Sequence, residues 1–427
     1  MNRKKMTAIF MGLFFIGFVA LSGCSQVTGG ESPDVAKDTV KIGVTGPLTG
    51  ETANTGIAIK EGMELAVKEW NDQGGIEIDG QSLEVEMIFE DNQGQPSEGV
   101  SAAEKLLNND NVDFLIGDAF ASSVTMAIMD LAPQYEMPIL SGASVSGEIS
   151  RKVEGDPEKY KYFWKGQHNS SFYGESVYYT IESLVENGDF EPGDKTVAFV
   201  MEDTDYGRSI VDDASRLFEE NGWEIVSVDP VSMDYTDFYP QLTKIQSLNP
   251  DVLVSCFTSV SSGVALVKQF QETGVNSFHM GVYYPIRTEF LEQAQGSADG
   301  LVWAPLTFAP SIWEDQKIFA ETITEHFDFD ISSVTNDHAV GYDTMNNALT
   351  AIDQAQSLDP DKIVEQLSQL QRRGLLGTYE FDQSNHTAKG GPDFLPVPAS
   401  QIQNGKNVAI WPDNVANGEY QPQPWVE

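Results

Sequence analysis

The sequence contains few cysteines, histidines and basic residues, and each shortage argues against a class of protein. Two Cys in 427 residues exclude a disulfide scaffold and a Cys-based zinc cluster. The five His are scattered, with no H-E-x-x-H or other close pair, so no metal site is expected. The 25 Lys and Arg against 65 Asp and Glu give a formal net charge of −40, so we expect no nucleic-acid partner.

Catalytic signatures are also missing. No G-x-x-x-x-G-K-[ST] phosphate loop occurs, and the glycines after the first strand, Gly43 and Gly46, lack the G-x-G-x-x-G spacing. The segment 142–146 departs from the nucleophile elbow G-x-S-x-G at its last position, and no triad partners follow it. We therefore expect no catalytic residue, no cofactor and no enzymatic activity.

Only the N-terminus holds a long apolar run. Basic residues at 3–5 precede the apolar segment 9–20, which is shorter than the ~18–20 residues of a membrane-spanning helix. The segment ends in Leu-Ser-Gly before Cys24 and resembles the bacterial lipobox. This predicts a lipoprotein signal peptide over 1–23, a lipid on Cys24, and a flexible tether over 24–39. An ordinary secretory signal or an uncleaved anchor is the alternative. With the lipid, the protein is expected outside the cytoplasm, anchored to the cell membrane.

From residue 40 the sequence alternates strands and helices. Short β-branched or apolar runs are followed by amphipathic stretches of ten or more residues, first over about 40–140 and again over about 196–294. The stretch after 310 is mostly helical, near 313–327, 338–355 and 360–370, and the Pro-, Gly- and Asn-rich tail from 390 is expected to lie across a surface. Such alternation predicts an α/β fold with two Rossmann-like lobes built on parallel sheets.

Hydroxyl-rich loops follow two neighbouring strands of the first run. Ser122 and Ser123 stand where a helix begins, and the segment 141–144 follows the next strand. The carboxyl ends of parallel strands meet at one sheet edge, so the two loops are expected side by side. Hydroxyls and free backbone N–H groups there suit a small anion without any Lys or Arg. Plain N-capping is the alternative for the two serines.

Several segments, in order from about 40 to 425, resemble periplasmic binding proteins for branched-chain amino acids. These segments are 40–50 (VKIGVTGPLTG), 69–76 (EWNDQGGI), 89–93 (FEDNQ), 203–207 (DTDYG), 237–239 (DFY) and 376–382 (LGTYEFD). The resemblance implies a type I periplasmic binding protein fold, with the ligand between two lobes and three crossings near Lys165, Tyr284 and Thr378. The N-terminal lobe is then expected over 40–164 and 286–377, and the C-terminal lobe over 165–285 and 378–427.

The resemblance also implies ligand-binding residues. The loops matching Ala121, Ser122 and Ser123, and Ala143 and Ser144, hold the ligand carboxylate in that family.

Three further positions come from the same resemblance. Tyr206 is expected to cover the ligand from the second lobe, and Thr55 stands where the family has an aromatic residue. Tyr283 stands where amino-acid binders often place an acid for the ligand ammonium. Either Asp118, Asp203 or Asp205 then supplies the missing acid, or the ligand has no α-ammonium.

The function implied is that of a substrate-binding protein that captures a small ligand, of the branched-chain amino-acid type, and delivers it to the permease subunits of an ABC importer. A binder of an amide or small carboxylate lacking an α-ammonium, or a sensor module, is the alternative.

The acids are spread along the whole chain, as on a solvated acidic surface. Cleavage before Cys24 would remove three basic residues and no acid, and would take the net charge from −40 to −43. Salt screens the self-repulsion of such a surface, so we predict a protein from a salt-loving microbe. Its thermal unfolding temperature should rise with added sodium chloride, and maximal stability at low salt would contradict this.

Overall fold

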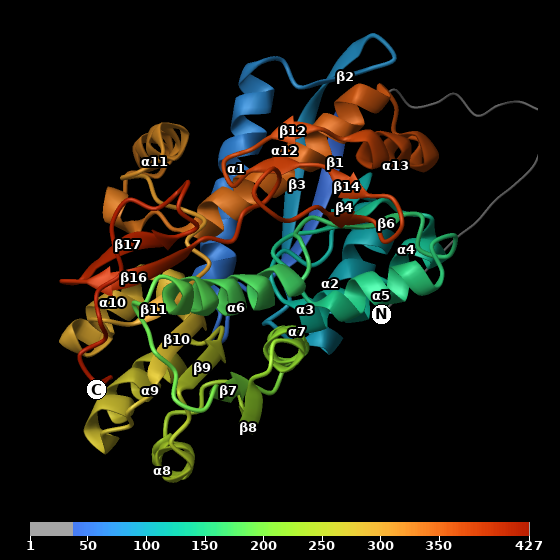
Figure 1. Ribbon diagram of the computed structural model, residues 1–427. Coiled ribbons are helices and arrows are strands. Elements are labelled where there is room, and N and C mark those ends of the chain that lie inside the picture. Colours follow the sequence, from blue (N-terminus) through green and yellow to red (C-terminus); the bar gives the residue numbers. More distant parts are fainter. Residues whose placement is uncertain (1–36, 427) are drawn as a thin grey trace, which may run out of the picture. The chain divides into compact units, whose positions relative to one another are not determined.

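Two sheets of mostly parallel strands organise the chain, and each forms the centre of one lobe (Figure 1). The computed structural model describes residues 37–426. The predicted signal peptide over 1–23, Cys24 and most of the predicted tether over 24–39 lie outside these residues. From residue 38 onward the chain forms one unit. Among its helices none combines the length and the apolar character needed to cross a bilayer. The predicted α/β class is confirmed.

The first sheet has eight strands in the order β14-β15-β6-β5-β4-β1-β3-β2, with only the end strands β2 and β14 antiparallel to their neighbours. Its strands are β1 (Thr39–Gly46), β2 (Ile76–Ile78), β3 (Gln81–Asp91), β4 (Phe114–Ile116), β5 (Ile139–Ser141), β6 (Phe163–Lys165), β14 (Phe381–Asp382) and β15 (Thr387–Ala388). The helices of this first lobe are α1 (Ala53–Asp72), α2 (Pro96–Lys105, continued by the turn η1, Leu106–Asp110), α3 (Ser122–Ile128), α4 (Leu131–Tyr135), α5 (Gly147–Gly155), α11 (Glu314–Phe327), α12 (Asn336–Ala355) and α13 (Pro360–Gln369).

The second sheet has seven strands in the order β17-β16-β11-β10-β9-β7-β8, and β16 and β17 are its antiparallel members. Its strands are β7 (Thr196–Glu202), β8 (Glu224–Val231), β9 (Val252–Phe257), β10 (Phe278–Tyr283), β11 (Val302–Ala304), β16 (Ala399–Gln403) and β17 (Lys406–Trp411). The helices of this second lobe are α6 (Ser171–Glu186), α7 (Asp205–Glu220), α8 (Tyr239–Leu248), α9 (Val260–Thr273) and α10 (Thr288–Ala294). Short turns η2 (Tyr284–Ile286), η3 (Gln295–Ala298) and η4 (Ile331–Ser333) and the pair β12 (Arg372–Arg373) and β13 (Thr378–Tyr379) complete the elements.

Buried apolar runs explain the central strands. Every residue of β9 and β10 is buried, as expected for strands covered on both faces. In the first lobe, α1 and α12 cross closely, side by side in Figure 1. A Cβ added at Gly62 of α1 would lie 1.9 Å from the carbonyl oxygen of His338, so only glycine permits this approach of the two helices.

Both lobes share one strand order. Strand β1 lies between β3, which follows it in the chain on one side, and β4, which comes next on its other side. In the second sheet β7 lies between β8 and β9 in the same way. In each sheet the reversal leaves a crevice at the carboxyl ends of the two strands that flank it. The loops that follow β1 and β4, and those that follow β7 and β9, are therefore the expected walls of a ligand site.

Two of the expected lobe borders are wrong. The border at 286 fails because α10 and β11 still belong to the second lobe, where β11 pairs with β10. The border at 378 fails because β14 and β15 return to the first sheet, where Thr387 pairs with Lys165. The chain thus crosses after β6, after β11 and between β15 and β16. Strand periodicity does not reveal which sheet a strand joins, because that choice depends on contacts distant in sequence.

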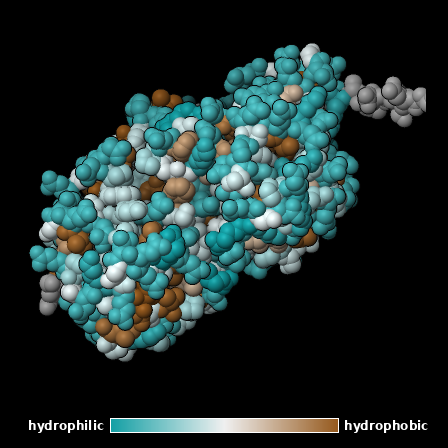
Figure 2. Space-filling model, turned by 45° about the vertical axis from the view of Figure 1, so that its right-hand side comes forward, coloured by the Kyte–Doolittle hydropathy of each residue, from teal (hydrophilic) through white to brown (hydrophobic). Residues whose placement is uncertain are grey.

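Two segments were not recognised from the sequence. Helix α6 lacks a regular apolar stripe, because its buried positions include serine, threonine and tyrosine as well as aliphatic residues. The tail expected to lie on a surface instead forms β16 and β17, which extend the second sheet. The exterior is largely hydrophilic on the face seen in Figure 2, as the spread of acidic residues predicts.

Candidate functional site

A cavity of about 400 Å³ lies at the carboxyl ends of both sheets. The first lobe contributes loops after β1, β3, β4 and β5, and the second lobe contributes α6 and the loops or ends of β7, β8, β9 and β10. The lining residues are Gly50, Glu51, Thr52, Gln93, Gly94, Gln95, Phe120, Ala121, Ser122, Ser123 and Ala143 from the first lobe, and Tyr173, Thr204, Tyr206, Met233, Asp234, Thr258 and Tyr283 from the second. No Lys, Arg or His is among these described lining residues.

The loop after β4 is held by the buried carboxylate of Asp118. Its Oδ2 accepts hydrogen bonds from the backbone N–H of Ala121 at 2.6 Å and of Phe120 at 3.0 Å, and its Oδ1 accepts from Asn92 Nδ2 at 2.6 Å. Burial raises the pKa of Asp118 to about 6, although these hydrogen bonds oppose the rise. Asp118 therefore braces the loop and does not line the cavity.

Helix α3 begins at this loop with its first turn facing the cavity. Its N-cap is Ala121, which has no side-chain acceptor, so no side-chain cap satisfies the N–H groups of the first turn. Ser122 and Ser123 both line the cavity. The Ser123 hydroxyl is half-buried and forms no hydrogen bond within residues 37–426. The helix start thus offers N–H and O–H donors to a ligand.

The loop after β5 is tied to the loop after β4. The backbone N–H of Gly142 donates to Asp118 O at 2.8 Å, and that of Ala143 donates to Ala119 O at 2.9 Å. A Cβ at Gly142 would meet Ala119 O at 2.2 Å, which explains the glycine. Ser122 Oγ also accepts from the backbone N–H groups of 145 and 146, at 3.3 and 3.2 Å. The two hydroxyl-rich loops therefore lie side by side.

Six of the eight residues expected at the ligand line the cavity, and two do not. Ser144 is buried, and its hydroxyl donates to Ser141 Oγ at 2.9 Å, behind the wall that Ala143 forms. Thr55 is buried within α1, and the wall there is formed by Thr52 instead. Both differences have one cause, because sequence spacing alone does not show which side chains at a helix start or in a loop point inward.

Aromatic rings form much of the second-lobe wall. Tyr206, at the start of α7, packs edge to face against Tyr173 of α6 and against Tyr283 of β10, with ring centroids 6.3 and 5.9 Å apart. Phe120 of the first lobe lies 6.4 Å from Tyr283. These four rings are mostly buried. They suit an apolar part of a ligand.

The hydroxyl of Tyr283 joins an ion pair between the lobes. Arg287 follows β10 in the second lobe, and Asp337 lies at the start of α12 in the first. The Arg287 Nη1 to Asp337 Oδ2 distance is 2.6 Å, and both side chains are buried. Arg287 Nη2 also donates to Tyr283 Oη at 3.2 Å. This arrangement fixes the ring at the cavity and joins the two lobes beside it.

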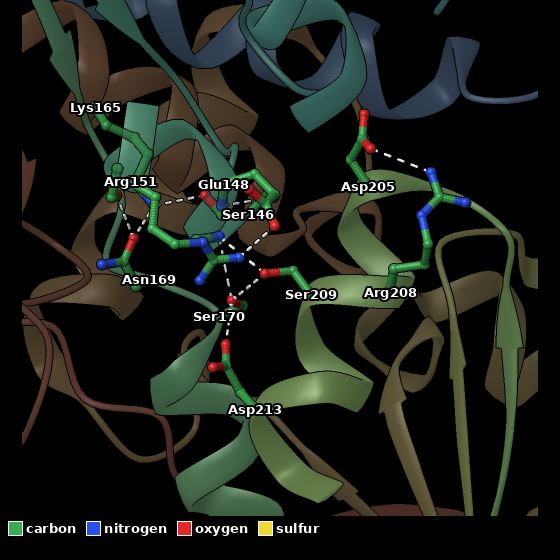
Figure 3. A network of polar contacts seen from close by, with 12 residues as sticks. Ser146, Glu148, Arg151, Lys165, Asn169, Ser170, Asp205, Arg208, Ser209 and Asp213 are labelled. Carbon is green, nitrogen blue, oxygen red and sulfur yellow. Dashed lines mark hydrogen bonds and ion pairs between the residues drawn. The ribbon is translucent and has the colours of Figure 1, made fainter. Parts of the chain in front are cut away.

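Further polar contacts join the lobes at α5 and α7 (Figure 3). The backbone N–H of Gly147, at the start of α5, donates to Ser209 Oγ of α7 at 3.0 Å. Ser170, before α6, bonds Ser209 at 2.7 Å and donates to Asp213 at 2.6 Å. Lys165, where the first crossing begins, donates to Asn169 Oδ1 at 2.7 Å and to the carbonyl of His168 at 3.0 Å. Burial strongly lowers the pKa of this lysine.

Acidic side chains near the cavity differ in how they are paired. Asp203 and Asp205 both contact Arg208 and do not line the cavity. Glu202 accepts hydrogen bonds from Thr258 Oγ1 at 2.6 Å and from the backbone N–H of Ser259 at 2.8 Å. Burial raises the pKa of Glu202, and the nearby charge of Asp234 adds to this.

Asp234 is one of the lining residues that the sequence did not single out. Its Oδ1 is buried and has no hydrogen-bond partner. The available signal was its place three residues after β8, at the same sheet edge as Thr204 and Thr258.

The described residues were also searched for a metal-binding group and for a reactive thiol. Over 37–426, no group of three or more His, Cys, Asp or Glu is arranged to hold a metal ion. Cys256 is a buried free thiol whose pKa is raised well above its usual value by burial. It packs within the apolar core.

Known proteins resemble this chain over nearly its full length. A family model described as "Periplasmic binding protein" matches residues 39–400. A leucine-, isoleucine-, valine-, threonine- and alanine-binding protein of Pseudomonas aeruginosa is 22% identical over 386 residues, which cover 89% of this chain and 92% of that protein.

Solved structures share the fold. The substrate-binding protein of a branched-chain amino acid transporter from Streptococcus pneumoniae, in complex with isoleucine, has a TM-score of 0.72 at 22% identity, covering 88% of this chain and 100% of that one. A solute-binding protein of an ABC transporter from R. palustris, in complex with benzoate, has a TM-score of 0.72 at 16% identity, covering 91% and 99%.

The raised pKa of Asp118 predicts a pH-dependent stability. A carboxyl whose pKa is about 6 in the folded chain and 3.8 when exposed stabilises the fold fully below about pH 4, and this contribution is lost as the pH rises through about 6. The stability difference between wild type and Asp118→Asn should therefore fall by about 2–3 kcal/mol from pH 4 to pH 7, at about 1.4 kcal/mol per pKa unit. Urea unfolding at several pH values measures this difference.

Asp251→Asn is the matched control. Hydrogen bonds from the backbone N–H of Gly193 and Thr196 outweigh the effect of burial and lower the pKa of Asp251. Its stability difference should stay flat between pH 5 and pH 7. A flat profile for Asp118→Asn as well would contradict the account of Asp118.

Proposed function

The chain belongs to the periplasmic binding protein family, and on this premise we propose that it captures a small solute outside the cytoplasm and delivers it to an ABC importer. The proposed ligand is an amino acid of the branched-chain type. The observation that carries this proposal is a cavity at the carboxyl ends of both sheets, with donor groups on one wall and aromatic rings on the other. No chemical step is proposed, and the residues named below bind without catalysing.

Binding is proposed to act through closure of the lobes. A ligand in the cavity contacts loops of both sheets, so its binding energy favours the state in which the lobes are close. The contacts of Gly147 with Ser209, and of Arg287 with Asp337, join the lobes in this arrangement. A permease that distinguishes the closed from the open form then receives only the loaded protein.

The first-lobe wall is proposed to hold the ligand carboxylate. The first turn of α3 supplies unpaired backbone N–H groups, and the hydroxyl of Ser123 is free to donate. Ser122 acts mainly by holding the neighbouring loop, because its oxygen already accepts two backbone hydrogen bonds. A buried anion is stabilised by such dipoles without a full positive charge.

The aromatic wall is proposed to enclose the apolar part of the ligand. Phe120, Tyr173, Tyr206 and Tyr283 are buried around the cavity, and Met233 adds a flexible apolar side chain. A cavity of about 400 Å³ falls within the range of small-molecule sites.

A second candidate is a ligand with a carboxylate and no ammonium, such as an aromatic acid. It is favoured by Tyr283, which replaces the acid expected at that position. The structural similarity to the benzoate complex of R. palustris is compatible with it. A thermal-shift screen of aliphatic amino acids, amides and aromatic acids distinguishes the two candidates, and no stabilisation by any of them would refute solute binding.

We also propose that Cys24 carries the lipid anchor that holds the protein at the cell membrane. Support comes from the Leu-Ser-Gly-Cys segment after the apolar run. In a bacterial host, Cys24→Ser should abolish labelling by radioactive palmitate and release the protein from the membrane fraction. Cys256→Ser is the control and should label as the wild type does. Labelling that survives Cys24→Ser would refute the anchor.

The carboxylate cradle predicts a specific loss of affinity. Ser123→Ala removes one hydrogen bond to a charged group and should weaken binding of the best ligand by about 1–2 kcal/mol, or about 10-fold. Isothermal titration calorimetry measures the change. Ser144→Ala is the matched control, because its hydroxyl bonds Ser141 behind the wall, and it should leave affinity unchanged. Equal effects of both variants would contradict the cradle.

A further inference from the structure

A second cavity, of about 120 Å³, adjoins α6 and shares no lining residue with the cavity at the strand ends, here called the interlobe cavity. On α6 it is lined by Phe172, Glu175, Ser176 and Tyr179, whose spacing of three and four places them on one face of the helix. The facing wall belongs to the crossing between β15 and β16 and to the end of β17, and it carries Trp411 and several prolines. Cavities of about 150 Å³ hold a molecule the size of benzene, so this one has room for a small organic group.

Aromatic side chains stand on both walls of the second cavity. The ring of Phe172 is fixed against the crossing, because a Cβ added at Gly390 would lie 2.4 Å from it. Tyr179 is 47% exposed and Trp411 is partly exposed, so both rings have surface that a ligand can cover. The face of an aromatic ring carries partial negative charge and attracts a cation, most strongly for Trp. The walls therefore suit a group that is apolar in shape and positive in charge.

Glu175 is the charged residue of this lining, and nothing in the described chain pairs with it. It is partly buried and forms no hydrogen bond or ion pair within residues 37–426. Burial raises the pKa of Glu175, the charge of Arg216 opposes the rise, and that of Asp213 adds to it. The guanidinium of Arg216 binds Glu220 at 3.2 Å. With no basic side chain among the described lining residues, the carboxylate of Glu175 is left to a cation that enters the cavity.

Ser176 is a second unpaired polar group on the same wall. It is 1% exposed, and its Oγ has no hydrogen-bond partner in the described chain. A serine within a helix can donate to the carbonyl four residues earlier, as Ser101 does to Ser97, but Ser176 does not. A buried hydroxyl without a partner destabilises a fold, and an apolar side chain here would avoid that cost. The polar character of this face of α6 is therefore not explained by packing.

We propose that the second cavity binds a small organic cation of the quaternary ammonium type, with its methyl groups against Phe172, Tyr179 and Trp411 and its charge beside Glu175. A quaternary ammonium has no N–H to donate, so it requires an apolar enclosure of negative potential, which aromatic rings and one carboxylate supply. An anion is repelled by Glu175, and a neutral molecule leaves this carboxylate unpaired. The net charge of −40 also attracts cations to the surface. This inference is independent of the ligand proposed for the interlobe cavity.

The experiment titrates choline and its neutral isostere 3,3-dimethylbutan-1-ol into the purified protein by isothermal titration calorimetry. The two probes share one shape and differ by a carbon atom in place of the charged nitrogen. The wild type should bind choline about 10-fold more tightly than the isostere. Glu175→Gln keeps the shape of the side chain and removes its charge, so it should weaken choline about 10-fold and leave the isostere unchanged. Tyr179→Ala should weaken choline about 3- to 10-fold.

Glu186→Gln is the matched control, because this exposed acid lies on α6 outside the lining, and it should bind choline as the wild type does. The interlobe cavity also has aromatic walls, so the variants locate the site. An unchanged choline affinity in Glu175→Gln or in Tyr179→Ala would overturn the proposal, as would an equal loss in Glu186→Gln. Equal affinity of the wild type for both probes, or no binding of choline, would overturn it as well. Thermal unfolding without probe shows which variants fold, and either of the two lining variants suffices for the test.

Discussion

The buried carboxylate of Asp118 is the constraint on which the first-lobe wall depends. It gathers the backbone of the loop after β4 and the side chain of Asn92 from the loop after β3. The main chain of the same loop then holds the loop after β5 through Gly142 and Ala143. Helix α3 then starts after its N-cap Ala121, and no side chain caps the N–H groups of its first turn, which faces the cavity. The donors proposed to bind a ligand are thus ordered by an acid that lies outside the cavity wall.

The second lobe is built on the same strand order but presents a different surface. Tyr206 and Tyr283 line its wall, where Ser122 and Ser123 line that of the first lobe. The Arg287–Asp337 pair joins the two at the edge of the cavity, and a buried pair of this kind is costly to break because either charge alone would be unpaired. The pair lies beside Tyr283, which lines the cavity. The relative placement of the lobes and the shape of the cavity therefore depend on the same contacts.

The sequence predicted more of the first wall than of the second. Hydroxyls after consecutive parallel strands must share a sheet edge, and Ser122, Ser123 and Ala143 line the cavity as that rule requires. Ser144 and Thr55 do not, because orientation within a turn depends on contacts such as that with Ser141. The lobe borders were misplaced since β11 and β15 choose their sheets by pairing with distant strands. Asp234 was not recognised because an unpaired oxygen is a property of the folded environment, and no local motif encodes it.

The acidity of the chain bears on the ligand in a way that composition alone did not indicate. At a net charge of −40, a free anion approaching the cavity is repelled over a range set by the Debye length, about 8–10 Å at physiological salt. A zwitterion carries no net charge and meets no such long-range barrier. At short range, the proposed ligand carboxylate meets the N–H groups of the first turn of α3. An acidic surface and a cavity without basic residues are therefore compatible with tight binding of a carboxylate-bearing solute, provided that its charge is internally balanced.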